Sequence, residues 1–513
     1  MNKKRILILN PPINDFSQYD LFSKPYGLLR IAKLLNILNV DFDFIDCMDK
    51  YLPYFSNRNK YIKGKTKEDG TGKFYKFEIE IPEKLKITNK KYFRFGLSNE
   101  DFFDFLSNLK EFDYVFININ FSFHYNIIYE IVPIIKKHSK NSKIYLGGIF
   151  SKLAKYDILN NFGNLFKFID GIAPQNINEF LVFLIQNNIT KEDPIMKIKK
   201  FFFKEQIYKI KDNCFQNSFN ENFNNIIIKD SFILPYWDLY DKLDYGILRT
   251  TVGCPFNCKY CASKLIDPKY EEIEDNFIID EIEYFFKRKI FNIAFYDDAL
   301  LLNKSHLINI FKKIEQIKER FENNLKTDLF YNYLINDKIN DINNKISFYL
   351  PNAIHIKFFD EEIAEWFKKL NFKMIRFGFE SLDEEKNKIR GEKFGKDDIL
   401  RVINIIEKAR INKDYIKFYL LIGLPDQTFE EVKYSVNFLT ENGLKTYFAF
   451  YSPIKGTYYY NIILENFKKG IIKNDIEDFL WHNPAIYTFF NTDFNEDIVR
   501  SYKRCSREGK IIT

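Results

Sequence analysis

The sequence predicts an α/β protein in two units, an N-terminal doubly wound parallel sheet followed by a partial (β/α)6 barrel. Two observations support this fold class. Short apolar segments alternate with amphipathic segments over residues 5–190 and again over 241–457, which is typical of strands joined by helical crossovers. The second series holds six strands with helices between them in roughly 210 residues, whereas a full eight-strand barrel needs about 250.

The first unit is predicted over residues 1–190. Its apolar or alternating segments predict strands at Arg5–Leu9, Asp41–Asp46, Tyr114–Ile119 and Lys143–Leu146. The amphipathic segments predict helices at Tyr26–Leu38, Tyr125–Lys137, Lys152–Asn161 and Asn176–Gln186. A doubly wound sheet binds its ligand at the carboxyl ends of its strands, and the loops expected there are 10–25, 120–124 and 147–150.

Residues 50–100 interrupt this alternation. They are rich in Lys, Tyr and Gly and include Gly70-Thr71-Gly72-Lys73, which lacks both the spacing of a phosphate-binding loop and a preceding strand. We therefore expect a surface excursion. Residues 191–240 are polar, rich in Lys and Asn and weakly periodic, which predicts a linker between the two units.

The second unit, the barrel, is predicted over residues 241–457, with the aromatic segment 458–513 as a C-terminal cap. Its predicted strands are Tyr245–Thr251, Asn292–Tyr296, Ser347–Leu350, Met374–Phe379, Ile416–Ile422 and Thr446–Tyr451. Its predicted helices are Asp275–Lys287, Ser305–Glu322, Glu361–Lys369, Lys396–Arg410 and Phe429–Thr440. Thr428 and Glu431 have the spacing of a capping box at the last of these helices.

Composition excludes several classes of protein. Charged residues make up 29% of the chain and hydrophobic residues 46%, which excludes a mainly disordered protein. No apolar run reaches the roughly 18 residues that span a bilayer, and the run Ile6–Leu9 is too short for a secretory signal, so we expect a cytoplasmic protein without a membrane partner. The net charge of +7 on 513 residues does not call for nucleic acid. A tRNA- or protein-modifying enzyme stays an alternative, because the lysine-rich stretch Arg58–Arg94 could contact a phosphate backbone.

The most specific pattern is a CxxxCxxC loop, Cys254, Cys258 and Cys261, directly after the first predicted barrel strand. The chemistry of a barrel enzyme lies at this end of its strands. Structural zinc and ordinary iron–sulfur clusters take four protein ligands, whereas this loop supplies three. A 4Fe–4S cluster held by three cysteines leaves one iron open to a small molecule. Zinc completed by Cys214 or Cys505, and a cluster that only transfers electrons, are the alternatives.

This loop in this setting resembles the radical S-adenosylmethionine (radical SAM) superfamily. The resemblance implies an enzyme with a 4Fe–4S cluster on the three cysteines and S-adenosylmethionine on the open iron. Reductive cleavage of that cofactor would give a 5′-deoxyadenosyl radical, which abstracts hydrogen from a substrate. It also implies a small-molecule substrate and a reductant such as a flavodoxin or ferredoxin. It assigns no catalytic residue and does not identify the substrate.

The resemblance extends beyond the cysteines to the ends of the later predicted barrel strands. Tyr260 matches the family's aromatic residue beside the adenine, and Asp297 and Asp298 stand where a short polar motif holds the methionine amino group. The later strand ends contain the G-x-E-S element, a Gly-Leu-Pro turn and a P-x-x-G-T turn. The cofactor-binding residues implied there are Glu380, Ser381, Ile422, Gly423 and Tyr451. Asn352 and His355, after the third strand, are candidates for substrate contact.

Residues 5–190 resemble the cobalamin-binding-like domain, a Rossmann or flavodoxin-like sheet, that precedes the barrel in one branch of the superfamily. Gly147-Gly148-Ile149 after a strand fits that domain. Loop 10–25, however, contains no histidine, whereas many such domains carry a cobalt-ligating histidine there. The sequence therefore leaves open whether cobalamin binds. With cobalamin we expect radical methyl transfer; a non-enzymatic iron–sulfur protein is the remaining alternative.

Overall fold

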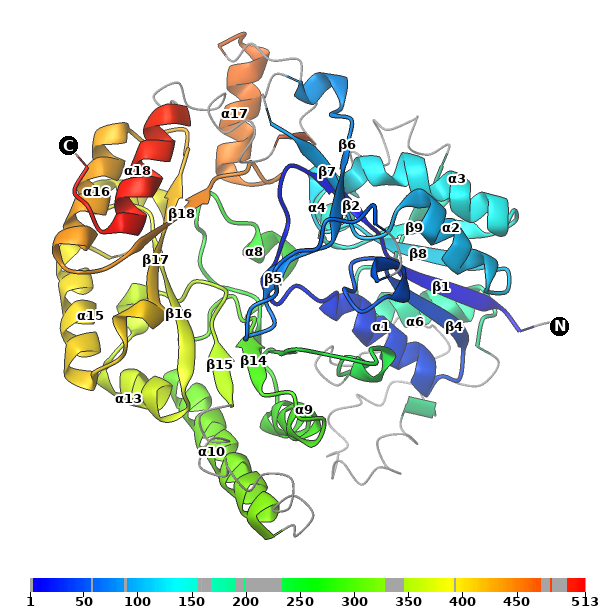
Figure 1. Ribbon diagram of the computed structural model, residues 1–513, viewed down its shortest axis with the longest axis horizontal. Helices are drawn as coiled ribbons and strands as arrows, with labels where there is room; N and C mark the ends of the chain where they lie inside the picture. Colours follow the sequence, from blue (N-terminus) through cyan, green and yellow to red (C-terminus); the bar gives the residue numbers. More distant parts are fainter. Residues whose placement is uncertain are drawn as a thin grey trace, which may run out of the picture. The chain divides into compact units, whose positions relative to one another are not determined.

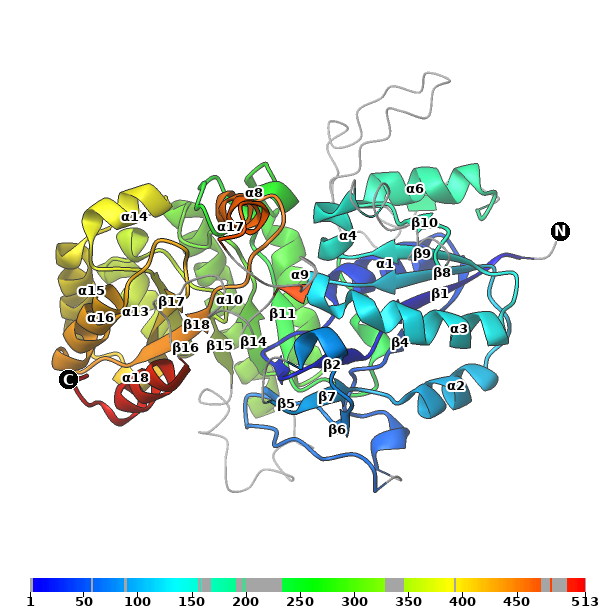
Figure 2. The ribbon, with the colours of Figure 1, turned by 90° about the horizontal axis from the view of Figure 1, so that it is seen from above.

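The computed structural model describes residues 3–56, 59–86, 90–155, 158, 168–190, 197–198, 233–327, 346–391, 394–471, 480–481 and 496–512. It divides into two compact units (Figures 1 and 2). The first comprises residues 1–66 and 72–242, and the second comprises 67–71 and 243–513. Cys214 and most of the predicted linker 191–240 lie outside the described residues.

The first unit is built on a five-stranded sheet in the order β10-β9-β8-β1-β4, with every neighbouring pair parallel. The inner strand β1, between β8 and β4, buries Ile6 to Leu9 completely, as a strand covered on both faces must. The predicted doubly wound sheet is thereby confirmed. Its strands are β1 (Arg5–Asn10), β4 (Asp41–Asp46), β8 (Tyr114–Asn118), β9 (Lys143–Gly147) and β10 (Gly171–Ile172).

Helices cover both faces of this sheet. Right-handed crossovers place the helix between β1 and β4 on one face, and the helices that lead to β8 and β9 on the other, as Figure 1 shows for α1 against α2 and α3. Residues 156–157 and 159–161 of the predicted helix Lys152–Asn161 lie outside the described residues. The helices are α1 (Tyr26–Ile37), α2 (Asn99–Ser107), α3 (Ile128–His138), α4 (Ile149–Leu153) and α6 (Ile177–Gln186).

Two small antiparallel sheets form from the loop after β1 and the interrupting segment. One has the order β2-β7-β6 and the other pairs β3 with β5. Their strands are β2 (Ile13–Asp15), β3 (Tyr19–Asp20), β5 (Gly72–Lys73), β6 (Lys76–Ile79) and β7 (Tyr92–Phe95).

The segment Lys67–Thr71 differs from the predicted surface excursion, because it belongs to the second unit. Asn292, the first residue of β14, donates its side-chain amide to the Glu68 carbonyl at 3.2 Å. Thr71 is completely buried. The segment therefore packs at the amino ends of the barrel strands, opposite the end that carries the cysteine loop.

The second unit contains an open six-stranded sheet in the order β11-β14-β15-β16-β17-β18, in which all neighbours are parallel. This confirms the predicted partial (β/α)6 barrel. Its strands are β11 (Gly246–Leu248), β14 (Asn292–Phe295), β15 (Ser347–Tyr349), β16 (Phe372–Phe379), β17 (Ile416–Ile422) and β18 (Thr446–Phe450). A short ribbon, β12 (Thr251–Val252) with β13 (Glu271–Glu272), flanks the cysteine loop.

Helices follow the barrel strands, and Figure 1 shows them outside the sheet. The short helix after β16 was not predicted. In the part of the chain that is described, no helix has both the length and the apolar character to cross a bilayer. The helices are α8 (Ser263–Ile266), α9 (Asp275–Lys287), α10 (Lys304–Thr327), α13 (Glu361–Lys369), α14 (Glu384–Arg390), α15 (Lys396–Ala409), α16 (Phe429–Glu441), α17 (Tyr458–Lys468) and α18 (Glu496–Glu508).

Candidate functional site

The cysteine loop runs from Gly253 to Cys261, between β12 and α8. Gly253 has a φ of +77°, and a side chain there would place its Cβ 2.2 Å from the Lys269 carbonyl oxygen, so only glycine fits this turn. Cys254 is buried, whereas Cys258 and Cys261 are half-buried. The Ser263 backbone N–H donates to the Cys261 sulfur at 3.4 Å.

The donor set fits a cluster with one ligand site left open. Three thiols come from one loop, and each iron of a cluster binds its own thiolate, so the sulfur atoms need not converge on one point. A mononuclear zinc would draw its sulfur ligands to within about 3.8 Å of one another, given a Zn–S bond of about 2.3 Å. Among the described residues, no three His, Cys, Asp or Glu side chains are gathered closely enough to hold one metal ion.

Asp297, two residues after the end of β14, holds the chain that leads into this loop. Its Oδ1 atom accepts hydrogen bonds from the backbone N–H and hydroxyl groups of Thr250 and of Thr251, at 2.6–2.8 Å. The side chain is buried, and its Oδ2 atom has no hydrogen-bond partner among the described residues. Burial raises the pKa of Asp297, and the bonds from the two threonines oppose that effect.

Asp298 lies on the other side of the same strand end and is more accessible. Its side chain is 31% exposed, and its Oδ1 atom accepts a hydrogen bond from the Ser263 hydroxyl at 3.1 Å. Arg249 lies 3.9 Å from Oδ2. Burial raises the pKa of Asp298, and the Arg249 charge partly offsets this. Both aspartates therefore lie beside the cysteine loop but in different environments, and contact of either with a cofactor stays a prediction.

The third strand end also meets the cysteine loop. The His355 ring packs 4.5 Å from the ring of Phe256, between the first two cysteines. Asn352 donates its side-chain amide to the Asp297 carbonyl at 3.3 Å. Both predicted substrate-contact candidates thus support the loop and Asp297. Tyr260 is half-buried within the same loop.

Glu380 and Ser381 follow β16 and are both buried. The Ser381 hydroxyl accepts the Asp383 N–H at 3.1 Å, and its carbonyl accepts the Asn387 side-chain amide at 2.8 Å. Ser381 therefore shapes the turn into α14, while Glu380 precedes that turn at the carboxyl end of the strand.

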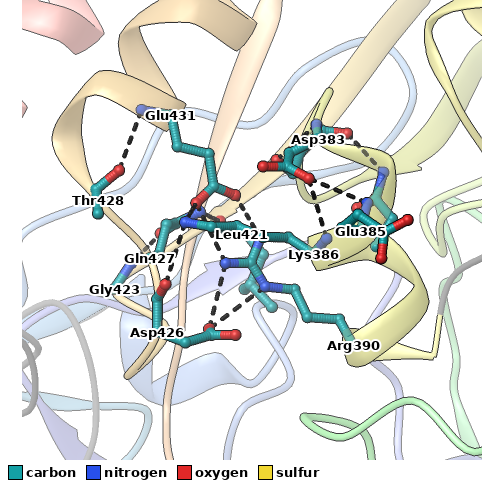
Figure 3. Close-up of polar contacts among 12 residues, drawn as sticks. Asp383, Glu385, Lys386, Arg390, Leu421, Gly423, Asp426, Gln427, Thr428 and Glu431 are labelled. Carbon is teal, nitrogen blue, oxygen red and sulfur yellow. Dashed lines mark hydrogen bonds and ion pairs between the residues drawn. The ribbon is translucent and has the colours of Figure 1, made fainter.

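The predicted adenine-facing backbone at the end of β17 makes its own internal bonds. The Gln427 side chain bridges this turn, accepting the Gly423 N–H at 2.9 Å and donating to the Leu421 carbonyl at 2.8 Å (Figure 3). The Ile422 carbonyl accepts the Tyr451 N–H at 2.9 Å. Tyr451 is almost completely buried, and burial raises its pKa well above the ordinary value.

A buried ion network, which sequence reasoning missed, lies behind these strand ends (Figure 3). Arg390, the last residue of α14, is completely buried and donates to Glu431 at 2.5 Å and to Asp426 at 3.2 Å. Lys386 reaches Glu431 at 2.6 Å, and the Tyr459 hydroxyl donates to Asp426 at 2.7 Å. In the sequence, Arg390 and Gly391 stand outside any recognised motif. A buried arginine has no local sequence pattern, so the sequence did not predict this network.

The same residues hold the middle of the cysteine loop through the backbone. The Lys259 N–H donates to the Arg390 carbonyl at 2.9 Å, and the Lys259 carbonyl accepts the Tyr459 N–H at 3.2 Å. Gly391 has a φ of +97°, and a Cβ there would lie 2.9 Å from the Cys258 Cα atom. The loop is therefore clamped between the end of α14 and the start of α17, and Arg390 and Asp426 connect these two anchors.

The capping box predicted at α16 is only half formed. The Thr428 hydroxyl accepts the Glu431 N–H at 3.3 Å, as predicted. The Glu431 carboxylate, however, binds Arg390 and Lys386 instead of returning to the Thr428 backbone. A charge-assisted pair with a buried arginine is stronger than a neutral backbone bond, which explains the difference.

The carboxyl end of the first unit's sheet carries a separate polar network. Asn118 donates to Asn10 at 3.1 Å, Asn10 donates to Asp46 at 2.7 Å, and the Tyr240 hydroxyl donates to Asp46 at 2.6 Å. His124, in the loop after β8, is buried with its Nε2 atom 3.0 Å from the Gln18 amide. The strand-end side chains thus bond to one another.

We expect Arg390→Met to lower the free energy of unfolding by about 3 kcal/mol, because it leaves the buried Glu431 carboxylate without its arginine partner. It should also reduce the iron retained after reconstitution, because the end of α14, whose Arg390 carbonyl accepts the Lys259 N–H, loses the ion pairs that hold it in place. Thermal unfolding and iron content per chain measure the two effects. Lys388→Met, which removes an exposed ion pair from the same helix, should change neither. Equal iron content in both variants would contradict the anchoring role.

The raised pKa of Asp297 predicts a pH effect. A carboxyl group whose pKa is higher in the folded than in the unfolded chain favours folding most below the unfolded value, near 4, and this contribution is lost as pH rises through the folded value. Asp297→Asn keeps the oxygen acceptor without the charge. The melting temperature of the wild type relative to this variant should therefore fall between pH 4 and pH 7. A difference that is constant over this range would show that Asp297 does not titrate as proposed.

Comparison with known proteins identifies the barrel. Residues 248–439 match the family model described as the Radical SAM superfamily. An uncharacterized methyltransferase of Pyrococcus horikoshii, PH0819, is 24% identical over 255 residues, 48% of each chain. The alignment thus spans about half the length of this curated relative.

Solved structures show the same fold across both units. The radical S-adenosylmethionine methyltransferase TsrM of Kitasatospora setae, with cobalamin and a [4Fe-4S] cluster bound, matches with a TM-score of 0.54 and 14% identity over 91% of this chain and 78% of that one. The TsrM structure with tryptophan and a SAM analogue matches with a TM-score of 0.53 and 14% identity. That match covers 90% of this chain and 76% of the TsrM chain. The predicted resemblance agrees with the family match, with the barrel and with the cysteine loop. The second unit contains a radical SAM domain at residues 248–439.

Proposed function

We propose that this protein is a radical SAM enzyme that holds a 4Fe–4S cluster on Cys254, Cys258 and Cys261. The observation that carries the proposal is the clamped three-cysteine loop at the carboxyl end of the barrel strands, within the residues that match the family model. When bound, such a cluster supplies the electron that cleaves S-adenosylmethionine and releases a 5′-deoxyadenosyl radical.

The two aspartates would have different roles at the cofactor site. Asp297 uses one oxygen entirely on Thr250 and Thr251, so its role is to position the loop. Asp298 is the more exposed carboxylate and lies beside Ser263, two residues after Cys261. It is therefore the residue that we assign to the ammonium group of the methionine moiety, because a carboxylate–ammonium hydrogen bond is charge-assisted.

The other predicted cofactor residues surround the same barrel end. Glu380 and Ser381 would lie at the ribose or the methionine end, and the turn at Ile422 and Gly423 would meet the adenine with its backbone. Tyr451 packs behind this turn, since its N–H bonds the Ile422 carbonyl. Tyr260, in the cysteine loop, would lie against the adenine ring.

The partners follow from this chemistry. The reaction needs a one-electron reductant, for which a flavodoxin or ferredoxin is suited, and a small-molecule substrate that supplies hydrogen to the radical. We expect the protein to act in the cytoplasm and without nucleic acid.

Anaerobic reconstitution with iron and sulfide, followed by S-adenosylmethionine and dithionite, should give 5′-deoxyadenosine. Cys258→Ala should abolish this product, because the cluster loses a ligand. Cys505→Ala, which removes a half-buried cysteine outside the loop, is the matched control and should retain it. Formation of the product by Cys258→Ala, or tightly bound zinc in place of iron, would exclude the proposed function.

Asp298→Asn should weaken binding of S-adenosylmethionine about 10- to 100-fold, because a hydrogen bond to a charged group contributes about 1.5–3 kcal/mol. Asp267→Asn is the control, since Asp267 also lies 3.9 Å from Arg249 and is 30% exposed. Equilibrium dialysis on reconstituted protein measures both. If Asp298→Asn and Asp267→Asn lost the same affinity for S-adenosylmethionine, the cause would be the lost negative charge near Arg249 and not a contact between Asp298 and the cofactor.

Cobalamin-dependent methyl transfer is a second candidate, favoured because both the curated relative and the TsrM structures are described as methyltransferases. The first unit would then hold cobalamin at the strand ends near Asn10, Asp46 and Asn118. Titration with aquacobalamin and its visible spectrum test this. Binding together with transfer of a labelled methyl group would establish methyl transfer, and absence of binding would leave hydrogen abstraction.

A further inference from the structure

Arg376, in the middle of β16, is a buried cation on the inner face of the barrel. The neighbouring Phe377 faces outward, because its ring lies 5.1 Å from Phe359, whose ring lies 5.9 Å from Phe367 of α13. Successive side chains of a strand point to opposite faces, so Arg376 points inward. It is only 5% exposed.

The Arg376 guanidinium is poorly satisfied by its surroundings. Its Nε and Nη1 atoms are buried and have no hydrogen-bond partner among the described residues. The guanidinium carbon lies 4.7 Å from the ring centre of Tyr419 and 5.6 Å from that of Tyr447. Within the part of the chain that the structure describes, no carboxylate forms an ion pair with Arg376. Burying an unpaired charge costs free energy, and binding of a group of opposite charge would offset that cost.

A second cation adds to this charge. Lys417 is paired in register with Arg376 on β17, and its ammonium lies 4.6 Å from the ring centre of Tyr447. Burial lowers the pKa of Lys417, and repulsion by Arg376 lowers it further. Tyr419 cannot compensate, because burial raises its pKa to about 12 and it stays neutral at pH 7. Tyr447 is 43% exposed, so the group is open to solvent on that side.

We propose that Arg376 and Lys417, flanked by Tyr419 and Tyr447, form an oxyanion-binding subsite inside the barrel. A guanidinium beside an ammonium matches the charge and the geometry of a carboxylate or a phosphate. The rings of Tyr419 and Tyr447 lie within cation–π distance of the guanidinium and border the subsite.

The anion belongs to a second molecule and not to S-adenosylmethionine. Arg376 precedes Glu380 by four residues, about 13 Å along an extended strand. The cofactor residues lie at the strand ends, so the subsite lies deeper in the barrel than the site proposed for the cofactor. We infer that the substrate carries a carboxylate or phosphate group that Arg376 and Lys417 bind. This inference rests on the proposed function.

Calorimetric titration of the full chain with inorganic phosphate, at fixed ionic strength, tests the subsite. The wild type should bind saturably, Arg376→Met should bind at least about tenfold more weakly, and Lys417→Met should also be weakened. Lys388→Met removes an exposed lysine paired with Glu385, away from Lys417, and should bind like the wild type. Absence of saturable binding, or equal binding by all four proteins, would overturn the proposal.

Thermal unfolding distinguishes a binding role from a structural one. Arg376→Met should melt no lower than the wild type, because it removes a buried charge that lacks a partner. A large fall in its melting temperature, with phosphate binding intact in Lys417→Met, would make Arg376 structural and overturn the subsite. Repeating the titration with succinate identifies which oxyanion is preferred.

Two further measurements keep this proposal separate from the proposed function. Saturating S-adenosylmethionine should leave phosphate binding unchanged; competition would assign the anion to the cofactor and overturn the inference. Formation of 5′-deoxyadenosine should persist in Arg376→Met. If the wild type formed none, while phosphate binding still depended on Arg376, the radical function would fail and the oxyanion subsite would stand.

Discussion

The buried ion pairs of Arg390 hold the end of α14, to which the cysteine loop is bonded. A loop without regular secondary structure has few internal bonds with which to present three thiols. Arg390 binds Asp426 and Glu431 with its side chain and the Lys259 N–H with its carbonyl, while Tyr459 joins Asp426 to the other side of the loop. The loop is therefore ordered by contacts that do not involve a cluster, which reduces the ordering cost when a cluster binds.

The entry to the loop is held by a different device, the Oδ1 atom of Asp297. Four hydrogen bonds to one oxygen fix Thr250 and Thr251 just before the first cysteine, and they leave Asp298 as the carboxylate that remains accessible. Adjacent residues at a strand end point in opposite directions, so one carboxylate can serve the protein while its neighbour serves a ligand. The two adjacent aspartates thus differ in burial and in hydrogen-bond partners.

The sequence predicted what local pattern determines. Apolar periodicity located all six barrel strands, and the spacing of Cys254, Cys258 and Cys261 located the loop. It did not predict contacts between distant segments. The Thr428–Glu431 spacing indicated a capping box, yet Glu431 binds Arg390, 41 residues earlier in the chain. Likewise, nothing local showed that Lys67–Thr71 would pack into the second unit, because that contact depends on Asn292 and on the residues before β11. Whether Tyr260, Glu380 and Ser381 contact a cofactor stays a prediction.

If both proposed sites are correct, the charges along the barrel would suit two ligands of opposite charge at different depths. Carboxylates, Asp298 and Glu380, lie at the strand ends, where a sulfonium and an ammonium group would be stabilised. The cations Arg376 and Lys417 lie deeper, where those groups would be repelled and an oxyanion attracted. Because like charges exclude the wrong ligand as effectively as opposite charges attract the right one, this separation favours one orientation of each ligand. The electrostatic cost of burying Arg376 is then the condition for that selectivity.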